Sequence, residues 1–366
     1  MSPKLPGRLG DISLALESEP RTHPGLIEAL KSYHLTGQIP GPPPGLTPSD
    51  PSTWVAFLAA LEVTFSNLYN NSDQSLPSDS AMPLLERTTL TAKGRSGNEI
   101  ALHITRPVNV TSGTLPAVVY IHGGAMIMVS TLAKFHTEWT KDIAAQGAIA
   151  VNLDFRNSDI TKPETTFPAG LHDCIDAVKF LHAKMKELGI GSIVLQGESG
   201  GANLSIATTL SLRREGLTKI VDGVYCLSPY LSGAYGETMK WKLEYLPSLV
   251  ECDGYFLNVD TMDYMAAAYD PYGKSRQSHD PLAWPYWVSE DELSGFPPTV
   301  VVMDELDPLR DEGVAFLRKC RRAGVKAVGR MNYGLCHAIE FMLRKELEAD
   351  HFATVRDIVA FARGFM

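Results

Sequence analysis

The chain has 366 residues, of which 44% are hydrophobic and 20% charged, and its formal net charge is −9. This length allows one large α/β domain or two small ones, and the composition is that of a globular protein. The acidic balance argues against nucleic acid and anionic membrane surfaces as partners, because both require clustered Lys and Arg. No stretch approaches 18 consecutive apolar residues, so we expect no membrane span.

The N-terminal residues and the cysteines both favour a reducing compartment. Residues 1–6 lack a continuous apolar segment, so we expect no secretory signal and a cytoplasmic location. The cysteines are odd in number and form no C-x-x-C pair, so free thiols are favoured over disulfides or a zinc site. They are Cys174, Cys226, Cys252, Cys320 and Cys336.

The first 80 residues read as an N-terminal extension. Residues 24–33 favour a short helix, and the Pro- and Gly-rich run 39–45 must be a loop or linker. Residues 52–69 predict an amphipathic helix, because apolar side chains recur at helical spacing. These side chains are Trp54, Phe57, Leu58, Leu61 and Phe65.

From residue 84 the pattern changes. Residues 84–91 and 99–105 alternate like the strands of a hairpin. Apolar runs then predict buried strands at 117–121, 148–151, 193–195, 224–227 and 299–303, and residues 326–331 are also strand-like. Helices are predicted between them at 135–146, 169–188, 202–214 and 311–323. This alternation predicts an α/β fold with a mostly parallel sheet flanked by helices.

Residues 230–290 interrupt this rhythm. The segment holds eight of the 13 tyrosines and three of the five tryptophans. These rings either pack an irregular insertion or line a pocket beyond the carboxyl ends of the strands, where such sheets bind ligands. We take Tyr230, Trp284 and Tyr286 as candidate substrate contacts, and we expect Tyr235 and either Trp54 or Phe57 to contribute to the pocket wall.

Ser199 lies in the sequence Gly197-Glu198-Ser199-Gly200-Gly201, directly after a predicted strand and before a predicted helix. This is the context of a nucleophile elbow, in which a tight turn projects the serine hydroxyl above the sheet edge. The pattern alone also fits a serine that caps a helix.

A serine nucleophile needs a base and an orienting acid. His337 lies in a loop-like stretch after the strand at 326–331 and is the favoured base, with His279 second. His351 falls in a terminal helical pattern and is expected to be exposed. Asp307 is the favoured acid, because Pro308 can begin the next helix and leave Asp307 at the end of the loop. Asp304 and Glu305 could also reach the site, whereas Asp311 and Glu312 suit a first helical turn.

The oxyanion hole should come from a glycine-rich loop after an early strand. His122-Gly123-Gly124-Ala125 follows the strand at 117–121 as required. The backbone N–H groups of Gly123, Gly124 and Gly200 are the candidate donors. We interpret His122 as a structural residue of this loop.

Together these stretches resemble the hormone-sensitive-lipase-like branch of the α/β-hydrolases, and bacterial-type carboxylesterases in particular. The resemblance covers residue 84 to the C-terminus, and its motifs are His122–Ala125, Asp154–Arg156, Phe167–Gly170, Gly197–Asn203 and Asp307–Gly313, ending with His337. It implies an α/β-hydrolase fold, a Ser199-Asp307-His337 triad, and a cap built from residues 1–80 and an insertion around 230–290. The catalytic domain would span residues 81–366.

The chain also departs from the usual motifs of that branch. Glu198 and Gly200 replace the common Asp and Ala of the elbow, and Ala125 replaces a third glycine. Neither change removes a backbone donor. Residues 157–160 also differ from the usual Leu-Ala-Pro-Glu, which bears on the local loop and on substrate preference.

The sequence therefore predicts a serine carboxylic-ester hydrolase that acts on a small-molecule ester through an acyl-enzyme, with no cofactor or metal. Small to medium esters are expected, with aromatic or natural-product esters among the candidates. Acyl transfer or lactone opening on a secondary metabolite is the alternative, and a non-catalytic small-molecule receptor is the weaker one. A homodimer is compatible with the sequence.

Overall fold

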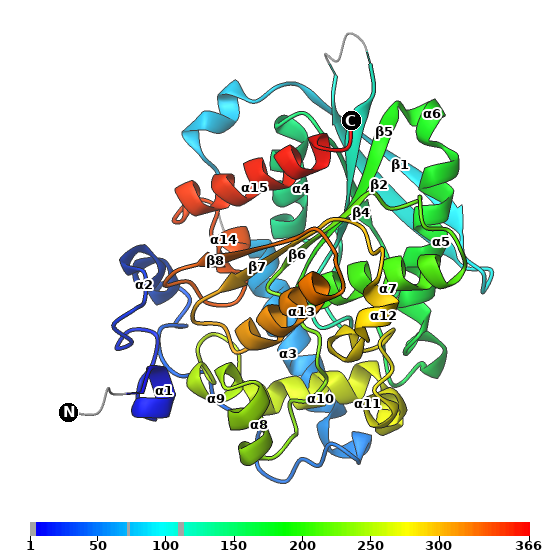
Figure 1. The fold of residues 1–366 in the computed structure, drawn as a ribbon. Coiled ribbons are helices and arrows are strands. Elements are labelled where there is room, and N and C mark those ends of the chain that lie inside the picture. The colour runs from blue at the N-terminus through cyan, green and yellow to red at the C-terminus, as the bar shows by residue number, and fades with distance from the viewer. Residues whose placement is uncertain (1–4, 72–73, 109–112) are drawn as a thin grey trace.

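The computed structural model describes residues 5–71, 74–108 and 113–366, and its centre is an eight-stranded sheet (Figure 1). The strands lie in the order β1-β2-β4-β3-β5-β6-β7-β8. Their bounds are β1 Leu85–Lys93, β2 Glu99–Pro107, β3 Leu115–Ile121, β4 Ile149–Leu153, β5 Ile190–Glu198, β6 Gly223–Leu227, β7 Thr299–Asp304 and β8 Ala327–Asn332.

Most of the sheet is parallel. Strands β1 and β2 form an antiparallel hairpin, and β2 also pairs antiparallel with β4. All neighbours from β4 to β8 are parallel. Strands β4, β6 and β7 are buried along their whole length, which explains their unbroken apolar sequences, because helices cover both faces. The predicted α/β sheet is confirmed, with the hairpin at one edge.

The covering helices follow the strands in the chain. Helices α4 and α15 pack against each other and on β3 and β4, whereas α5 and α7 pack together over the opposite face (Figure 1). Helix α13 lies on β7 and β8. The bounds are α4 Lys134–Ala145, α5 Ala169–Ala183, α6 Met185–Leu188, α7 Gly200–Arg214, α13 Arg310–Arg322, α14 Ile339–Met342 and α15 Glu348–Arg363, with the 3-10 turn η2 Pro163–Thr165.

Two segments lie outside this core. The N-terminal one contains α1 Gly7–Gly10, α2 Pro24–Lys31, α3 Pro51–Asn71 and η1 Pro77–Ala81. The insertion after β6 contains α8 Met239–Tyr245, α9 Ser248–Glu251, α10 Val259–Tyr269, η3 Pro271–Gly273, α11 Lys274–Ser278, η4 Pro285–Trp287 and α12 Glu290–Leu293. They meet where Trp54 and Phe57 of α3 both pack edge-on against Tyr264 of α10, with ring centroids 6.3 Å apart in each pair.

The expectation that His351 is exposed was wrong. Its ring is buried, with Nε2 3.0 Å from Asp142 Oδ2 and Nδ1 2.9 Å from the Glu340 carbonyl oxygen. Arg344 also binds Asp142, through its Nε at 2.5 Å, and reaches Asp79 on η1. This buried network joins α4 to the C-terminal helices, and a helical sequence pattern cannot reveal it.

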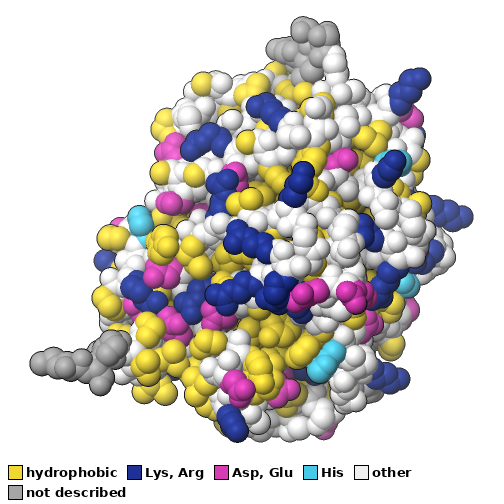
Figure 2. All heavy atoms as spheres, viewed as in Figure 1, with side chains coloured by type: hydrophobic (Ala, Val, Ile, Leu, Met, Phe, Trp, Pro, Cys, Tyr) yellow, Lys and Arg dark blue, Asp and Glu magenta, His cyan; other side chains and the backbone are white. Residues whose placement is uncertain are grey.

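The surface is mixed in character. On the face shown in Figure 2, basic and acidic side chains are interspersed. Exposed apolar side chains include Met239, Leu243 and Tyr245 of α8. No helix in the described ranges is long and apolar enough to cross a membrane.

Candidate active site

The turn between β5 and α7 holds Ser199 in a strained backbone conformation. Its φ is 54° and its ψ is −120°, although side-chain-bearing residues seldom adopt positive φ. Backbone hydrogen bonds fix both sides of the turn: Ser199 donates its N–H to Leu227 at 2.9 Å, and its carbonyl accepts the Tyr230 N–H at 3.1 Å. Such strain is typical of a nucleophile elbow.

The elbow also needs close backbone packing. A Cβ at Gly201 would lie only 1.8 Å from the carbonyl oxygen of Ile121, at the end of β3. Helix α7 therefore begins directly against the neighbouring strand, and this explains the second glycine after the serine. The contact brings the start of α7 beside the loop that follows β3.

His337 and Asp307 meet at the same edge of the sheet. His337 Nδ1 lies 2.9 Å from Asp307 Oδ2, and both side chains are buried. A carboxylate only accepts hydrogen bonds, so Nδ1 carries the proton and Nε2 is left as the basic nitrogen. Burial lowers the pKa of His337, but the nearby Asp307, Asp304 and Glu198 carboxyl groups outweigh it, and the net pKa lies above 6.5.

The other acids near β7 have separate partners. Asp304 Oδ2 accepts hydrogen bonds from Ser228 Oγ at 2.6 Å and from the Ala338 N–H at 2.7 Å. It thereby holds the residue next to His337. Burial, together with the charge of Asp307, raises the pKa of Asp304 to about 6.

The remaining carboxylates are also engaged. Asp311 accepts the Ser248 N–H, Glu312 accepts the Ser232 N–H, and Glu305 accepts the Gly334 N–H. Asp307 is therefore the carboxylate that contacts the histidine ring. The second candidate base, His279, is exposed and stacks on Trp287 with ring centroids 3.7 Å apart.

The glycine loop after β3 has several consecutive residues with positive φ, a backbone conformation that favours glycine. Gly124, Ala125 and Met126 have consecutive positive φ values of 87°, 52° and 62°. A Cβ at Gly200 would lie 2.8 Å from the Met126 nitrogen, so the loop lies directly beside the start of α7. No acceptor in the described residues binds the N–H of Gly124 or Ala125. The Gly200 N–H is also free of an intrahelical partner, because Gly200 is the first residue of α7.

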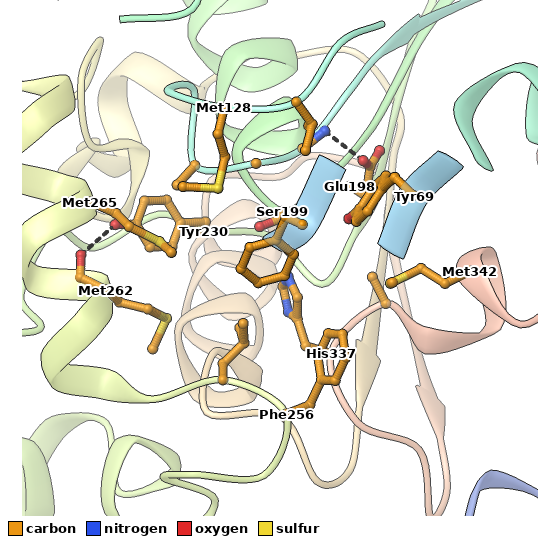
Figure 3. A pocket seen from close by; sticks show the side chains of 17 residues that line it. Tyr69, Met128, Glu198, Ser199, Tyr230, Phe256, Met262, Met265, His337 and Met342 are labelled. Atoms are coloured by element: carbon orange, nitrogen blue, oxygen red, sulfur yellow. Dashed lines mark hydrogen bonds between the residues drawn. The ribbon is translucent and has the colours of Figure 1, made fainter. Parts of the chain in front are cut away.

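The Gly123 N–H, in contrast, points to Glu198. It donates to Glu198 Oε1 at 2.5 Å, the contact drawn in Figure 3. Glu198 is only 2% exposed, and burial raises its pKa to about 8 against the opposing effect of this hydrogen bond. The sequence suggested Gly123 as an oxyanion donor, but in this structure its N–H is occupied.

His122 behaves as a structural residue. Its Nδ1 lies 2.8 Å from the Gly123 carbonyl oxygen, and its ring stacks on Phe155 with centroids 4.4 Å apart. Burial lowers its pKa to about 4, so the ring is neutral at pH 7. A neutral ring packed in this way stiffens the loop and is not placed to act as a second base.

A pocket above Ser199 has walls from three distant parts of the chain. Helix α3 contributes Phe65 and Tyr69, the insertion contributes several apolar side chains, and α14 contributes Met342. Figure 3 shows Met128, Met262 and Met265 on one side of Ser199 and Met342 on the other, with Phe256 beside His337. The full lining is Phe65, Tyr69, Gly123, Gly124, Ala125, Met128, Val129, Glu198, Ser199, Tyr230, Phe256, Leu257, Met262, Met265, His337, Ala338 and Met342.

Of the three candidate substrate contacts, the structure places Tyr230 in the pocket wall and the other two elsewhere. Trp284 is fully buried and packs edge-on against Tyr230, with centroids 5.8 Å apart. Tyr286 is half-buried, and its carbonyl accepts a hydrogen bond from Lys319. Tyr235 stacks on Tyr230 from behind and bonds Glu312. The rings of Trp284 and Tyr235 therefore support Tyr230 from outside the pocket lining. Trp54 and Phe57, of which one was expected in the wall, do not line the pocket and pack on Tyr264 instead. Aromatic content alone could not separate the two roles.

The N-terminal segment also contacts the loops that carry the acid and the base. The His23 N–H donates to the Gly334 carbonyl at 2.9 Å. Arg21 Nη1 and Arg310 Nη2 each lie 2.7 Å from the buried Glu251 carboxylate. Arg310 directly follows the turn that holds Asp307, so these contacts form an N-terminal clasp, residues 19–23, over both loops.

Comparison with known proteins agrees with this architecture. A sequence profile described as the alpha/beta hydrolase fold matches residues 118–341. The chain therefore belongs to the α/β-hydrolase family. Among solved structures it is similar to brefeldin A esterase, described as a bacterial homologue of human hormone-sensitive lipase, with 43% identity, 99% coverage of both chains and a TM-score of 0.95.

Other relatives point the same way. The esterase Est22 has 29% identity and a TM-score of 0.80, over 95% of this chain and 99% of that chain. An esterase from Fusarium pseudograminearum (strain CS3096) is 30% identical over 75% of this chain and 80% of its own length. The chain is thus an esterase of the carboxylesterase type in the hormone-sensitive-lipase-like branch.

Proposed function

We propose that the protein hydrolyses carboxylic esters through an acyl-enzyme on Ser199. One observation carries the proposal: Ser199, at a φ of 54°, shares a pocket with His337, whose Nδ1 lies 2.9 Å from the buried Asp307. His337 Nε2 takes the Ser199 proton as Oγ attacks the ester carbonyl. Asp307 stabilises the imidazolium that forms.

The tetrahedral intermediate carries its negative charge on the former carbonyl oxygen. In our proposal the N–H groups of Gly124, Ala125 and Gly200 bind this oxyanion, since Gly123 is bound to Glu198. His337 then protonates the leaving alcohol. Water attacks the acyl-enzyme with His337 as base, and this step releases the carboxylic acid and regenerates Ser199.

In the same proposal, residues 1–80 and the insertion around 230–290 act as a cap over the catalytic domain. Support comes from Phe65 and Tyr69 of α3 and from Met262 and Met265 of α10, which all line the pocket. Covering the site excludes water and strengthens electrostatic stabilisation of the oxyanion.

The decisive experiment compares Ser199→Ala with the parent protein. The variant should lose ester hydrolysis by about 10³-fold or more and should fail to react with a fluorophosphonate probe, while circular dichroism is unchanged. Residual hydrolysis near the parent level would refute the assignment. Brefeldin A belongs among the test substrates, because the esterase of similar structure is named for it. Added alcohol as competing acceptor tests for acyl transfer.

A further inference from the structure

The catalytic pocket is very small. Its cavity volume is about 50 Å³. For comparison, an engineered cavity of about 150 Å³ binds benzene, and small-molecule sites usually enclose roughly 300–1,000 Å³. The space next to Ser199 therefore holds the reacting ester group and a short arm. Any longer arm of the substrate must extend into a neighbouring space.

A larger groove adjoins this pocket. It lies between α3 and the chain that follows α2, and its volume is about 410 Å³. Two side chains, Phe65 and Phe256, line both cavities, so the two rings form the boundary between them. The other lining residues are Tyr33, Leu35, Ile39, Leu61, Thr64, Asn67, Leu68 and Asn71.

The chemistry of the groove is apolar. Its lining contains no charged side chain among the described residues, and its large members are aliphatic or aromatic. Leu35, Leu61 and Leu68 are only half-buried, so a ligand could cover further apolar surface there. Covering this surface with the methylene groups of a ligand would favour binding, because apolar area is removed from water on both sides.

A third cavity differs from the groove because charged side chains line it. It adjoins the catalytic pocket at Met128, and its volume is about 480 Å³. Its lining includes Glu62, Asp159 and Lys162. Charged groups of this kind suit a polar arm, so the two cavities differ in the chemistry that they accept.

The boundary residue Phe256 has an unusual backbone. Its φ is 68°, a conformation that bulky side chains rarely adopt. Such strain persists only where the surrounding structure enforces it, and it concentrates at functional sites. Here it places an aromatic ring between the catalytic pocket and the groove.

We propose that this groove binds the apolar arm of the ester, so that the enzyme prefers substrates with a medium or long aliphatic or aromatic arm. In this proposal, the substrate arm passes from the catalytic pocket into the groove when Phe65 or Phe256 changes rotamer. The proposal rests on the ester hydrolysis proposed above and adds a substrate class and a second binding region. It does not depend on whether the apolar arm is the acyl or the alcohol part.

The test fills the groove without touching the catalytic pocket. Thr64 is exposed and lines the groove but not the pocket, so Thr64→Trp should narrow it with little effect on the fold. Its neighbour Val63 is 60% exposed and lies outside the groove lining, which makes Val63→Trp the matched control. kcat/KM is measured for two ester series, one with acyl chains from acetyl to dodecanoyl and one of acetates with equally long alcohols.

We expect Thr64→Trp to lower kcat/KM for the long members of one series by about tenfold or more, because methylene burial is lost. Acetates of short alcohols should change less than about twofold, and Val63→Trp should match the parent protein throughout. The series that responds identifies the arm. If the long-to-short ratio in Thr64→Trp equals that of the control in both series, the proposal is wrong.

A covalent probe separates this inference from the proposed function. Fluorophosphonates with a methyl or an octyl chain should label Ser199 in the parent protein, and only the octyl probe should slow down in Thr64→Trp. If neither probe labels the parent protein, the nucleophile assignment has failed. If both label all variants at unchanged rates, the groove assignment alone has failed.

Discussion

Glu198 accepts a hydrogen bond from the Gly123 N–H at 2.5 Å, which ties the residue before the nucleophile to the first glycine of the loop after β3. A Cβ at Gly123 would lie 2.8 Å from Glu198 Oε1 and 3.2 Å from Ser199 Cβ, so the three residues are in close contact. The carboxyl group thus sets the distance between the elbow and the proposed oxyanion donors. Glutamate in place of the usual aspartate has a direct structural role.

This relationship predicts different effects for two variants of Glu198. Glu198→Gln keeps an oxygen acceptor for the Gly123 N–H and should retain activity within about tenfold. Glu198→Ala leaves that buried N–H without a partner, and it should lower kcat by about 10²-fold with little change in KM, because the loop supports the transition state. A transition-state analogue such as a trifluoromethyl ketone should bind Glu198→Ala more weakly than the parent protein, by a factor similar to the loss in kcat. Equal activity of the two variants would contradict the role.

The raised pKa of Glu198 adds a pH effect. Its pKa of about 8 means that the carboxyl group is mainly neutral at pH 7 and ionises above pH 8. A negative charge there opposes the developing oxyanion, so kcat/KM should decline above pH 8 in the parent protein. Glu198→Gln cannot ionise and should remove this decline. A decline that persists unchanged in the variant would assign it to another group.

A second pH effect concerns His337, which must be neutral to accept the Ser199 proton. Its pKa lies above 6.5, because nearby carboxyl groups favour the charged ring more than burial disfavours it. Activity should therefore fall as the pH decreases through that raised pKa. In Asp307→Asn the imidazolium loses its main partner, so the acidic limb should shift to lower pH and kcat should drop by about 10⁴-fold.

Asp311→Asn is the control for that experiment. Asp311 accepts hydrogen bonds from the Ser248 N–H and from Arg310, and it does not contact His337. The acidic limb of its kcat/KM profile should stay at the parent position. A shift as large as that in Asp307→Asn would mean that the acid has been misassigned.

The N-terminal clasp predicts that Arg21 affects catalysis on all esters. Arg21→Ala removes one partner of the buried Glu251 and should cost about 1–3 kcal/mol of stability. It should also lower kcat for short and long esters alike, because Arg310 and Glu251 adjoin the loop that holds Asp307. Lys31→Ala breaks an exposed pair with Glu28 and should change neither property. A selective loss on long esters would assign Arg21 to substrate binding instead.

Asp142 provides a test of stability apart from catalysis. Its carboxylate binds both Arg344 and His351 in the interior. Asp142→Ala leaves Arg344 with Asp79 and the Gln74 carbonyl oxygen as its remaining partners. It should lower the free energy of unfolding by about 3–5 kcal/mol in urea titrations. Glu138→Ala, on the same helix, removes a partly exposed pair with Lys141 and should cost less than about 1 kcal/mol. Equal losses would contradict the importance of the buried network.

The sequence predicted those features that depend on local patterns. The unbroken apolar strands, the amphipathic helix α3 and the elbow around Ser199 each have a short-range signal, and the structure places all three within a residue or a few of the expected bounds. The pairing of His337 with Asp307 was predicted from the loop position of each residue after a strand, and the family resemblance agreed with it. The structure brings the two side chains together.

The pocket walls were harder to predict, because they join segments far apart in the chain. Tyr69 continues the helical spacing of Leu61 and Phe65, and this signal could have identified it. Met128, Met262 and Met342 have no such signal, since their convergence depends on tertiary packing. The same applies to Trp284, whose burial behind Tyr230 only the packing reveals.

The close packing at Gly201 means that two parts of the active site differ in how many amino-acid substitutions they tolerate. A side chain at Gly201 would collide with the Ile121 carbonyl, and one at Gly197 would collide with the Gly201 backbone, so these two positions beside the nucleophile require glycine. The walls from α3, α10 and α14 are mainly apolar side chains that take no part in the proposed reaction steps. Mutant libraries that aim at new substrates should therefore be confined to those walls, and recombination of whole N-terminal segments between relatives should change substrate preference while the reaction stays the same.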